Sequence, residues 1–218
     1  MNRILALVIA LIALATVAPA AAAASPEPVL LVHGYRGDPS TWADMKAYLR
    51  NAGRSVYAID LASENNITNA KAIRDTLRAR GWTKVDIVGQ SMGGLSARWF
   101  TKFLADDFRV DAYVSIGTPQ YGIWSACVLP SWYGGQMCPT SSFLDKLNAG
   151  DDTPGRTFWT TIFSTGDEFV PTGRSRLDGG ACFVQVDGVD HNSMDNNAAV
   201  MGATLAGLDH ACAGTFRT

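Results

Sequence analysis

The sequence predicts an α/β fold, in which a mostly parallel, doubly wound sheet is covered by helices on both faces. Two observations lead to this prediction. Short apolar runs alternate with segments of helical periodicity along the chain, and the runs are apolar throughout instead of at every second position. Strands buried on both faces show this pattern, and their alternation with helices is typical of a parallel sheet. No internal repeat or linker interrupts the alternation.

The first two strand and helix pairs follow directly from local patterns. The apolar run PVLLV (28–32) predicts a buried strand, and the turn-rich HGYRGDPS follows it. Apolar side chains then recur near helical spacing over residues 41–51, and Gly53 stands where this helix would stop. RSVYAIDL (54–61) predicts the second strand. Residues 67–80 predict the second helix, with basic residues on the face opposite its apolar side chains.

The later elements are separated by one long irregular loop. Residues 85–88 predict a third strand, residues 92–104 a third helix and residues 112–116 a fourth strand. An aromatic loop that contains two cysteines then runs over residues 119–142. The remaining expected elements are a short helix at 142–147, strands at 159–164 and 183–186, and a final helix near 198–208.

The N-terminus has the features of a secretory signal peptide. One positive charge, Arg3, precedes an apolar run over residues 4–17, and small residues suited to cleavage follow at 18–24. A membrane anchor is the alternative, but the run is shorter than the ~20 residues that cross a bilayer. We therefore expect residues 1–24 to be a signal peptide and residues 25–218 to form a single domain. We expect the mature protein to be secreted, with no transmembrane anchor.

The charge balance of the chain is mildly acidic. The sequence holds 18 Lys and Arg against 20 Asp and Glu, a formal net charge of −2, and no long block of one sign. Nucleic acids and anionic membranes bind proteins through clustered basic side chains. We therefore expect neither of them to be the main partner.

All four cysteines lie in the part of the chain that we expect to be exported, where disulfides persist. Four cysteines allow three pairings. Cys127 and Cys138 flank one loop rich in Trp and Gly, which favours a bond between them. Cys182 and Cys212 would then tie the last predicted strand to the C-terminal tail. Zinc binding is the alternative, but no Cys-x2-Cys or pair of histidines accompanies the cysteines.

The stretch VGQSMGG places Ser91 in a Gly-x-Ser-x-Gly motif between a predicted strand and a predicted helix. In that context a tight turn lifts the serine hydroxyl above the sheet, and the small residues Gly89 and Gly93 let the backbone pass without collision. The hydroxyl also faces a helix N-terminus, whose free amides suit an oxyanion. The motif alone is weak evidence because Gly and Ser are common in loops. Its flanking elements make Ser91 the candidate nucleophile.

A serine hydroxyl becomes a good nucleophile only when a base takes its proton. The chain has three histidines. His33 precedes Ser91, against the order nucleophile, acid, base that this motif predicts. His210 has the right order but lies in the C-terminal tail. His191 follows the predicted strand 183–186 and a turn, where a loop at the carboxyl edge of the sheet would bring its imidazole to the serine, so we predict His191 as the base.

The imidazole in turn needs a carboxylate that fixes its tautomer and stabilises its charge. Asp167 stands just past a predicted strand, between nucleophile and base in chain order, at the sheet edge where ligands bind in open α/β folds. Glu168 is adjacent and is an alternative. Asp187 and Asp190 are further alternatives, but they lie so close to His191 that the loop would have to fold back on itself. Order and placement favour Asp167.

Charge that develops on a carbonyl oxygen under nucleophilic attack requires two backbone N–H groups, an oxyanion hole. The residue after the nucleophile, Met92, provides one of them. The loop after the first strand reads VHGYRG, which makes the N–H of Tyr35 the natural second donor, with Gly34 leaving room for the backbone. We predict Tyr35 and Met92 as the oxyanion hole.

Five segments together resemble small secreted bacterial lipases and esterases of the α/β-hydrolase superfamily. They are PVLLVHGYRG, VDIVGQSMGG, QMCPTSSFLDKLN, TTIFSTGDEFVP and VQVDGVDHNSM, and they span nearly all of the expected mature chain. The resemblance implies an α/β-hydrolase fold and a serine ester hydrolase (lipase or carboxylesterase) that needs no organic cofactor. The residues it implies are a triad of Ser91, Asp167 and His191 with the oxyanion donors Tyr35 and Met92.

Comparison with that family also separates Asp167 from Glu168, because the family's acid matches the Asp of STGDEFV. Two features of this sequence depart from the family pattern. The loop at 119–142 is longer and more aromatic than in the smallest lipases, which lack a lid, and Asn192 is polar where apolar residues are usual. The acyl pocket is therefore expected to differ.

Large apolar side chains in and near this loop suggest a surface for an acyl chain or for a lipid–water interface. An equally good interpretation is that they pack the loop against the body. A disulfide across so short a loop makes a large swinging lid unfavourable, so we expect short to medium acyl esters as substrates. The side chains concerned are Trp124, Val128, Trp132 and Tyr133 of the loop, with Tyr35 and Phe169 nearby.

Two other functions use the same features. An acyltransferase would pass the acyl group to an alcohol instead of water, and a binding protein would keep the fold without activity. The second usually lacks members of the triad. No metal is expected, because Asp187, Asp190 and Asp195 lack the spacing of a calcium loop.

Overall fold

The computed structural model describes residues 26–216, so the expected signal peptide at 1–24 lies outside the described residues. The strands are β1 (Val29–Val32), β2 (Val56–Ile59), β3 (Lys84–Gln90), β4 (Arg109–Ile116), β5 (Phe158–Ser164), β6 (Cys182–Val186) and β7 (Thr215–Phe216). The α-helices are α1 (Ala43–Asn51), α2 (Asn66–Arg80), α3 (Met92–Phe103), α4 (Ser142–Leu147), α5 (Thr172–Ser175) and α6 (Ala198–Leu208). Short 3-10 helices are η1 (Pro39–Trp42), η2 (Trp124–Val128), η3 (Gly135–Met137) and η4 (His191–Ser193).

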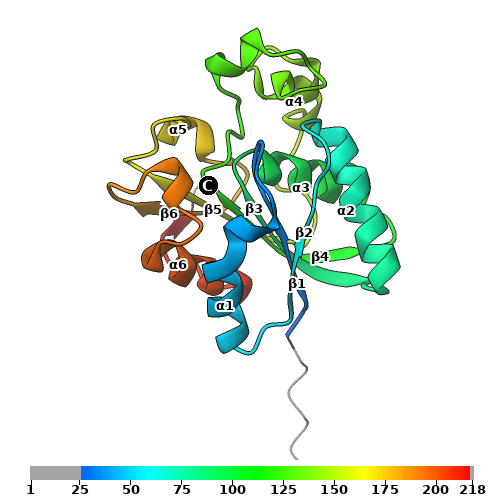
Figure 1. The fold of residues 1–218 in the computed structure, drawn as a ribbon, viewed down its shortest axis with the longest axis vertical. Coiled ribbons are helices and arrows are strands. Elements are labelled where there is room, and N and C mark those ends of the chain that lie inside the picture. The colour runs from blue at the N-terminus through cyan, green and yellow to red at the C-terminus, as the bar shows by residue number, and fades with distance from the viewer. Residues whose placement is uncertain (1–25, 217–218) are drawn as a thin grey trace, which may run out of the picture.

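All seven strands of the described residues belong to one sheet, in the order β2-β1-β3-β4-β5-β6-β7. Strands β1 to β6 pair in parallel, and β7 runs antiparallel beside β6. Helices lie on both sides of the strands (Figure 1). The predicted mostly parallel, doubly wound α/β sheet is confirmed.

Strand β1 shows how the sheet separates two apolar cores. Val29 and Leu31 belong to a buried cluster that also contains residues of α1 and α6. Leu30 and Val32 point the other way, into a cluster with residues of α2, α3 and α4. All four side chains are fully buried. A central parallel strand must therefore be apolar at every position, which is why VLLV does not alternate.

Parallel pairing brings the carboxyl ends of the strands to one edge of the sheet, and the candidate site residues follow those ends. The segment 33–37 follows β1, and Ser91 follows β3. Residues 165–168 follow β5, and residues 187–191 follow β6. Segments that are far apart along the sequence thus meet at this edge, as in other open α/β sheets.

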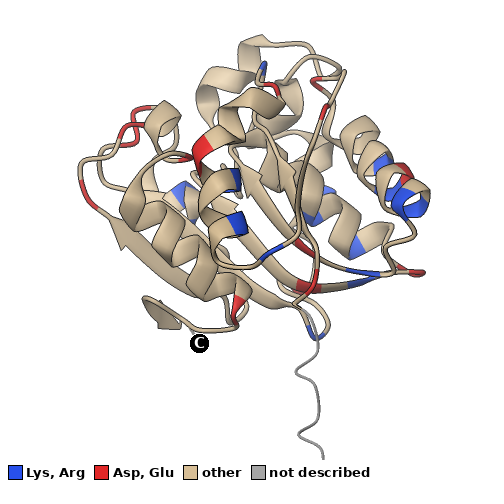
Figure 2. Cartoon of the chain, turned by 60° about the horizontal axis from the view of Figure 1, so that its bottom comes forward, with Lys and Arg blue, Asp and Glu red and all other residues tan. Residues whose placement is uncertain are grey.

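The opposite edge of the sheet, where the strands begin, carries ion pairs. Arg54 contacts Asp86 at 2.9 Å, Lys84 contacts Asp111 at 3.7 Å, and Arg109 contacts Asp111 at 2.7 Å. Figure 2 brings this side forward and shows basic and acidic residues interspersed on it. The charges at this edge are therefore mixed in sign.

The long loop between β4 and α4 is fixed to the body of the protein at several points. A disulfide joins Cys127 to Cys138, with their Cα atoms 4.6 Å apart, which is the pairing that the sequence favours. The Gly134 amide donates to the Glu64 carbonyl at 3.0 Å. The ring of Tyr133 meets that of Tyr35 edge-on at 5.6 Å. The loop is thus held against the segments that follow β1 and β2.

A second disulfide joins Cys182 of β6 to Cys212, also as the sequence favours. Strand β7 follows shortly after and pairs with β6 over two residues. Helix α5 and strand β7 are not predicted from the sequence, because four and two residues are too short to show a periodicity. Within residues 26–216 no helix combines the length and apolarity of a membrane span.

The fully buried Arg98 on α3 takes part in a hydrogen-bond network that links the loop after β4 to the loop after α4. The Arg98 guanidinium donates to Asn148 Oδ1 at 2.7 Å and to Asp152 Oδ1 at 2.5 Å. The Tyr121 hydroxyl donates to the other oxygen of Asp152 at 2.9 Å. Because Arg98 has no exposed surface, this network depends on every one of its hydrogen bonds.

Candidate functional site

Ser91 lies on a sharp turn between β3 and α3. Its φ of 52° and ψ of −127° are sparsely populated for a residue with a side chain, and such a conformation costs about 1–3 kcal/mol. The turn is held by hydrogen bonds from the Ser91 amide to the Ile116 carbonyl (2.8 Å) and from the Gly94 amide to the Ser91 carbonyl (3.1 Å). The strand-to-helix context that the motif predicts for Ser91 is therefore present.

The glycines on either side of the serine are required by close backbone contacts. A Cβ atom on Gly89 would lie 2.6 Å from the Gly94 amide nitrogen. A Cβ atom on Gly93 would overlap the carbonyl oxygen of Val32 at the end of β1. Neither position has room for a side chain, so the turn packs directly against the neighbouring strand, as the sequence predicts.

His191 and Asp167 form a buried pair. The distance from His191 Nδ1 to Asp167 Oδ2 is 2.8 Å, and the two side chains are 6% and 1% exposed. The other carboxylate oxygen, Oδ1, accepts the amides of Phe169 at 3.0 Å and Val170 at 2.8 Å. These backbone hydrogen bonds orient the carboxylate, and the carboxylate in turn fixes the orientation of the imidazole ring.

The backbone of His191 is held as firmly as its ring. Glu168 Oε2 accepts the His191 amide at 3.0 Å, and Gln90 Nε2 donates to the His191 carbonyl at 3.2 Å. The Phe169 ring stands edge-on to the imidazole, with the centroids 5.4 Å apart. Glu168, the alternative acid, therefore bonds the main chain and not the ring. Nothing in the sequence pattern singled out Gln90, because it occupies a variable position of the motif.

The loops that carry the acid and the base are bonded to each other. Ser164 Oγ at the end of β5 accepts the Val189 amide at 3.0 Å, and Thr165 Oγ1 accepts the Gly188 amide at 3.1 Å. Asp187, another alternative acid, accepts from Thr165 Oγ1 at 3.2 Å. These contacts fix the spacing between the two loops, and Asp187 contributes to them.

Gly117, directly after β4, lies under the Asp167–His191 pair. Its φ is +53°, and a Cβ atom there would lie 3.0 Å from Asp167 Oδ2 and 3.2 Å from His191 Nδ1. The sequence shows Gly117 only as a glycine after a strand, so its contact with the pair becomes visible only in the structure.

Ser91 and His191 line one cleft of about 850 Å³ at the carboxyl edge of the sheet. Asp167 lies behind His191 and does not line it. Tyr35 lines the cleft, and Met92 is the first residue of α3. A Cβ atom on Gly34 would lie 2.9 Å from Ser91 Cβ, so the loop after β1 passes directly beside the serine.

The other two histidines lie outside this arrangement. His33 is buried, and its Nε2 accepts the Leu61 amide at 3.0 Å. Its Nδ1 therefore carries the proton and donates to the Gly34 carbonyl at 3.0 Å, which makes the ring a structural link. His210 stacks on Phe158 with the centroids 5.1 Å apart. Asp190 accepts the Ser193 amide at 3.1 Å, and so caps η4.

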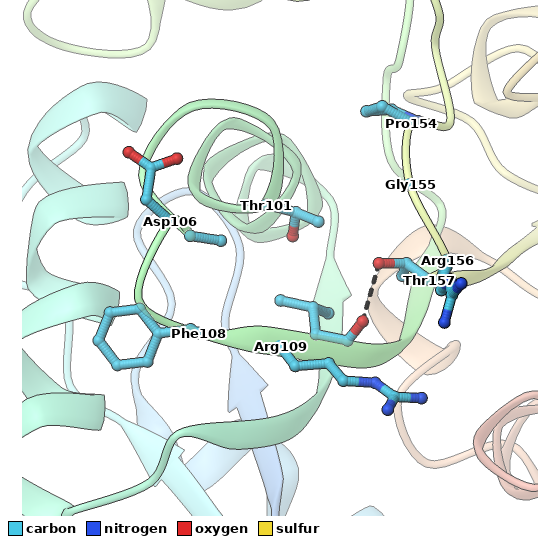
Figure 3. A pocket seen from close by; sticks show the side chains of 10 residues that line it. Thr101, Asp106, Phe108, Arg109, Pro154, Gly155, Arg156 and Thr157 are labelled. Carbon is cyan, nitrogen blue, oxygen red and sulfur yellow. Dashed lines mark hydrogen bonds between the residues drawn. The ribbon is translucent and has the colours of Figure 1, made fainter.

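A second, smaller cavity of about 360 Å³ lies where α3 ends and β4 begins (Figure 3). Arg109, Arg156 and Asp106 lie around it, and Thr157 Oγ1 donates to the Val110 carbonyl at 2.8 Å. No serine or histidine lines this cavity, so the candidate chemistry belongs to the larger cleft.

Comparison with known proteins gives one family and a consistent fold. The family model described as lipase (class 2) matches residues 26–205. A triacylglycerol lipase of Burkholderia plantarii is 30% identical over 122 residues, or 50% of this chain and 34% of the relative. The chain therefore spans about a third of the length of this curated relative.

Solved structures of other proteins share the fold at low sequence identity, and two of them serve as examples. The mature Bacillus licheniformis lipase BlEst2 superposes with a TM-score of 0.68 at 20% identity, covering 85% of this chain and 93% of that one. The α/β-hydrolase enzyme MGS-MChE2, from a lagoon sediment metagenome of Mar Chica in Morocco, gives a TM-score of 0.63 at 20% identity, covering 83% and 88%. The predicted α/β-hydrolase fold is confirmed.

Proposed function

Because the chain belongs to the lipase (class 2) family, we propose that it hydrolyses carboxylic esters through an acyl intermediate on Ser91. One observation carries the proposal. A serine held at a positive φ shares a cleft with a histidine whose Nδ1 lies 2.8 Å from a buried carboxylate. A hydroxyl on a strained turn that lines the same cleft as an oriented base is the arrangement that nucleophilic catalysis requires.

In the proposed reaction, His191 Nε2 takes the Ser91 proton while Oγ attacks the ester carbonyl carbon. The tetrahedral intermediate collapses, the bond to the alcohol oxygen breaks, and that oxygen takes the proton from Nε2. Water then repeats the sequence on the acyl-serine ester, which releases the carboxylic acid and restores the serine. Asp167 stays ionised throughout and stabilises the imidazolium.

The oxyanion donors in this proposal are the amides of Tyr35 and Met92. The Tyr35 amide has no hydrogen-bond acceptor within residues 26–216. The Met92 amide lies in the first turn of α3, where helical amides have no intrahelical partner and the helix dipole is positive. Both groups are available to a carbonyl oxygen near Ser91, and together they would stabilise the intermediate.

We further propose that the protein is exported as a single domain and acts on short to medium acyl chains. The two disulfides suit an oxidising compartment. The loop at 119–142 is closed by one of them and hydrogen-bonded to the body, so it serves as a fixed wall of the cleft. Trp124, Val128 and Trp132 are exposed on this loop and would let the protein settle on a lipid–water interface.

The test combines turnover with active-site labelling. Ser91→Ala is expected to lower kcat on p-nitrophenyl butyrate by about 10⁶-fold and to abolish covalent labelling by a fluorophosphonate. Ser40→Ala is the matched control, since Ser40 is exposed and does not line the cleft. A Ser91→Ala protein that keeps a tenth of the turnover would refute the proposal. A new ester formed with an added alcohol, in place of free acid, would make the protein an acyltransferase.

A further inference from the structure

The cleft around Ser91 has two chemically different walls. The apolar wall comes from the loop between β4 and α4 and consists of Ile123, Ala126, Leu129 and Met137, with Ser125 among them. The polar wall comes from the segments after β1 and β6 and consists of Arg36, Gly37, Thr41, Asn192 and Asp195. Phe169 and Val170 add apolar lining near His191, and Gly34, Tyr35 and Gln90 line the cleft around Ser91.

The two walls rest on opposite faces of the sheet. Ala126 and Met137 belong to the buried cluster shared with α2 and α3. Trp42 and Met194, which flank the polar wall in sequence, belong to the cluster shared with α1 and α6. In Figure 1 the loop that forms the apolar wall stands above the sheet, away from α1 and α6. An ester bound at Ser91 therefore has one substituent toward each wall.

The direction of proton transfer decides which substituent meets which wall. The alcohol oxygen leaves with the proton from His191, so the alcohol must lie on the His191 side of the serine. Asn192 and Asp195 follow His191 within four residues and line the cleft with it. The acyl chain, on the other side of the carbonyl carbon, is then directed to the apolar wall.

Asp195 is the most unusual member of the polar wall. It lines the cleft, yet only 6% of the residue is exposed. The backbone amides of Asp195 and Asn196 act on its carboxylate and lower its pKa, and an ionised carboxylate has about four acceptor sites, so capacity remains. Burial raises the pKa of Asp195 above its usual value. A buried carboxylate with unused acceptor sites requires a donor from the ligand or from water.

We infer that the alcohol part of the substrate carries free hydroxyl groups, as in a partial glyceride or another polyol ester, and that Asp195 accepts a hydrogen bond from one of them. The inference rests on the proposed function and adds the class of alcohol to it. The substrate then spans the cleft, with its acyl chain on Leu129 and its neighbours and its polyol on Asp195.

The first test compares two esters with the wild-type protein. Glyceryl monobutyrate and propyl butyrate share the acyl chain and a three-carbon alcohol and differ by two hydroxyls. After each kcat/KM is divided by the rate of alkaline hydrolysis, we expect the glyceryl ester to be preferred about tenfold, the effect of one hydrogen bond to a charged group. A normalised ratio near one would overturn the inference.

The second test locates the preference. Asp195→Ala is expected to bring the ratio close to one, and Asp195→Asn, which keeps a carbonyl acceptor without the charge, to reduce it about threefold. Asp44→Ala is the matched control: it removes a neighbouring charge that acts on Asp195 but does not line the cleft, so the ratio should persist. An unchanged ratio in both Asp195 variants would overturn the inference, and if Asp195→Ala does not fold, Asp195→Asn decides.

A third readout is the pH dependence of the same ratio in the wild-type protein. As the pH falls through the raised pKa of Asp195, the carboxylate is protonated and the preference should decline. Asp44 raises and His191 lowers this pKa. Both esters need the same base, so its titration cancels in the ratio. A protein inactive on p-nitrophenyl esters would refute the proposed function itself, whereas an active protein with an Asp195-independent ratio would refute only this inference.

Discussion

Gly117→Ala tests whether the position of the Asp167–His191 pair limits the reaction. The new methyl group would lie 3.0 Å from Asp167 Oδ2 and 3.2 Å from His191 Nδ1, closer than ordinary van der Waals contact at 3.4 Å or more. The pair must therefore shift by a few tenths of an ångström. A displacement of 1 Å in an active site costs about 100-fold in rate, so we expect kcat to fall about four- to tenfold.

The same substitution also strains the backbone. Gly117 has a φ of +53°, where a residue with a side chain is disfavoured by about 1–2 kcal/mol. For a chain of this size such a loss lowers Tm by about 2 to 8 °C. A drop in activity could then reflect poorer folding alone, so a control with equal strain is needed.

Gly81→Ala provides that control. Gly81 ends α2 with a φ of +65°, and a Cβ atom there meets nothing within 4 Å. We expect both variants to lose similar stability by thermal unfolding, and only Gly117→Ala to lose kcat on p-nitrophenyl butyrate at a temperature where both are folded. Equal kcat values in the two variants would show that the pair tolerates displacement and refute the reasoning.

Three further predictions concern the acid, a disulfide and the buried arginine. Asp167→Asn should lower kcat for ester turnover by about 10⁴-fold, because the imidazole loses its correct tautomer. Glu168→Gln keeps an oxygen that can accept the His191 amide, so it should lower kcat in the same assay by less than about tenfold. Replacing Cys127 and Cys138 with serine should reduce the free energy of unfolding in urea by about 3 kcal/mol, given their separation of 11 residues. Arg98→Ala should cost about 3–5 kcal/mol in the urea assay, because Asp152 loses its only oppositely charged partner among the described residues.

Each of these has an outcome that contradicts it. Equal losses in Asp167→Asn and Glu168→Gln would remove the distinction between the two carboxylates. A change below about 1 kcal/mol on loss of the disulfide would mean that the loop stays ordered in the unfolded chain. Arg98→Lys keeps the charge but not the fork of donors, and full stability in that variant would show that charge alone suffices.

Most strands of the sheet could be predicted, because a strand that is buried on both faces is apolar at every position and can be recognised from its own residues. All four side chains of β1 are fully buried, so the run VLLV is visible without any knowledge of its neighbours. Strand β7 shows no such pattern. Thr215 and Phe216 are exposed, and they pair with β6 near the disulfide that joins Cys212 to Cys182. Its existence depends on contacts distant in sequence, which no local pattern encodes.

The residues of the candidate site also fall into two groups, those that the sequence pattern identifies and those that only the structure reveals. Residues placed by chain order and by strand ends could be named from the sequence: Ser91 after β3, Asp167 after β5 and His191 after β6. Their catalytic roles stay predictions until the serine variant is assayed. Gln90 and Gly117 could not be found, because their importance comes from distances to His191 across different strands. Such distances exist only once the sheet is assembled.

The hydrogen bonds between the loops after β5 and β6 divide the site into two modules. The serine and the proposed amide donors come from the β1 and β3 side, while the carboxylate and imidazole are cross-linked to each other on the far side of β4. The proton-transfer pair is thus held mainly by these two loops, and the hydrogen bond from Gln90 to the His191 carbonyl links it to the strand of the nucleophile. A change in the loop at 119–142, or of the attacking atom itself, should therefore leave the spacing of this pair unaltered.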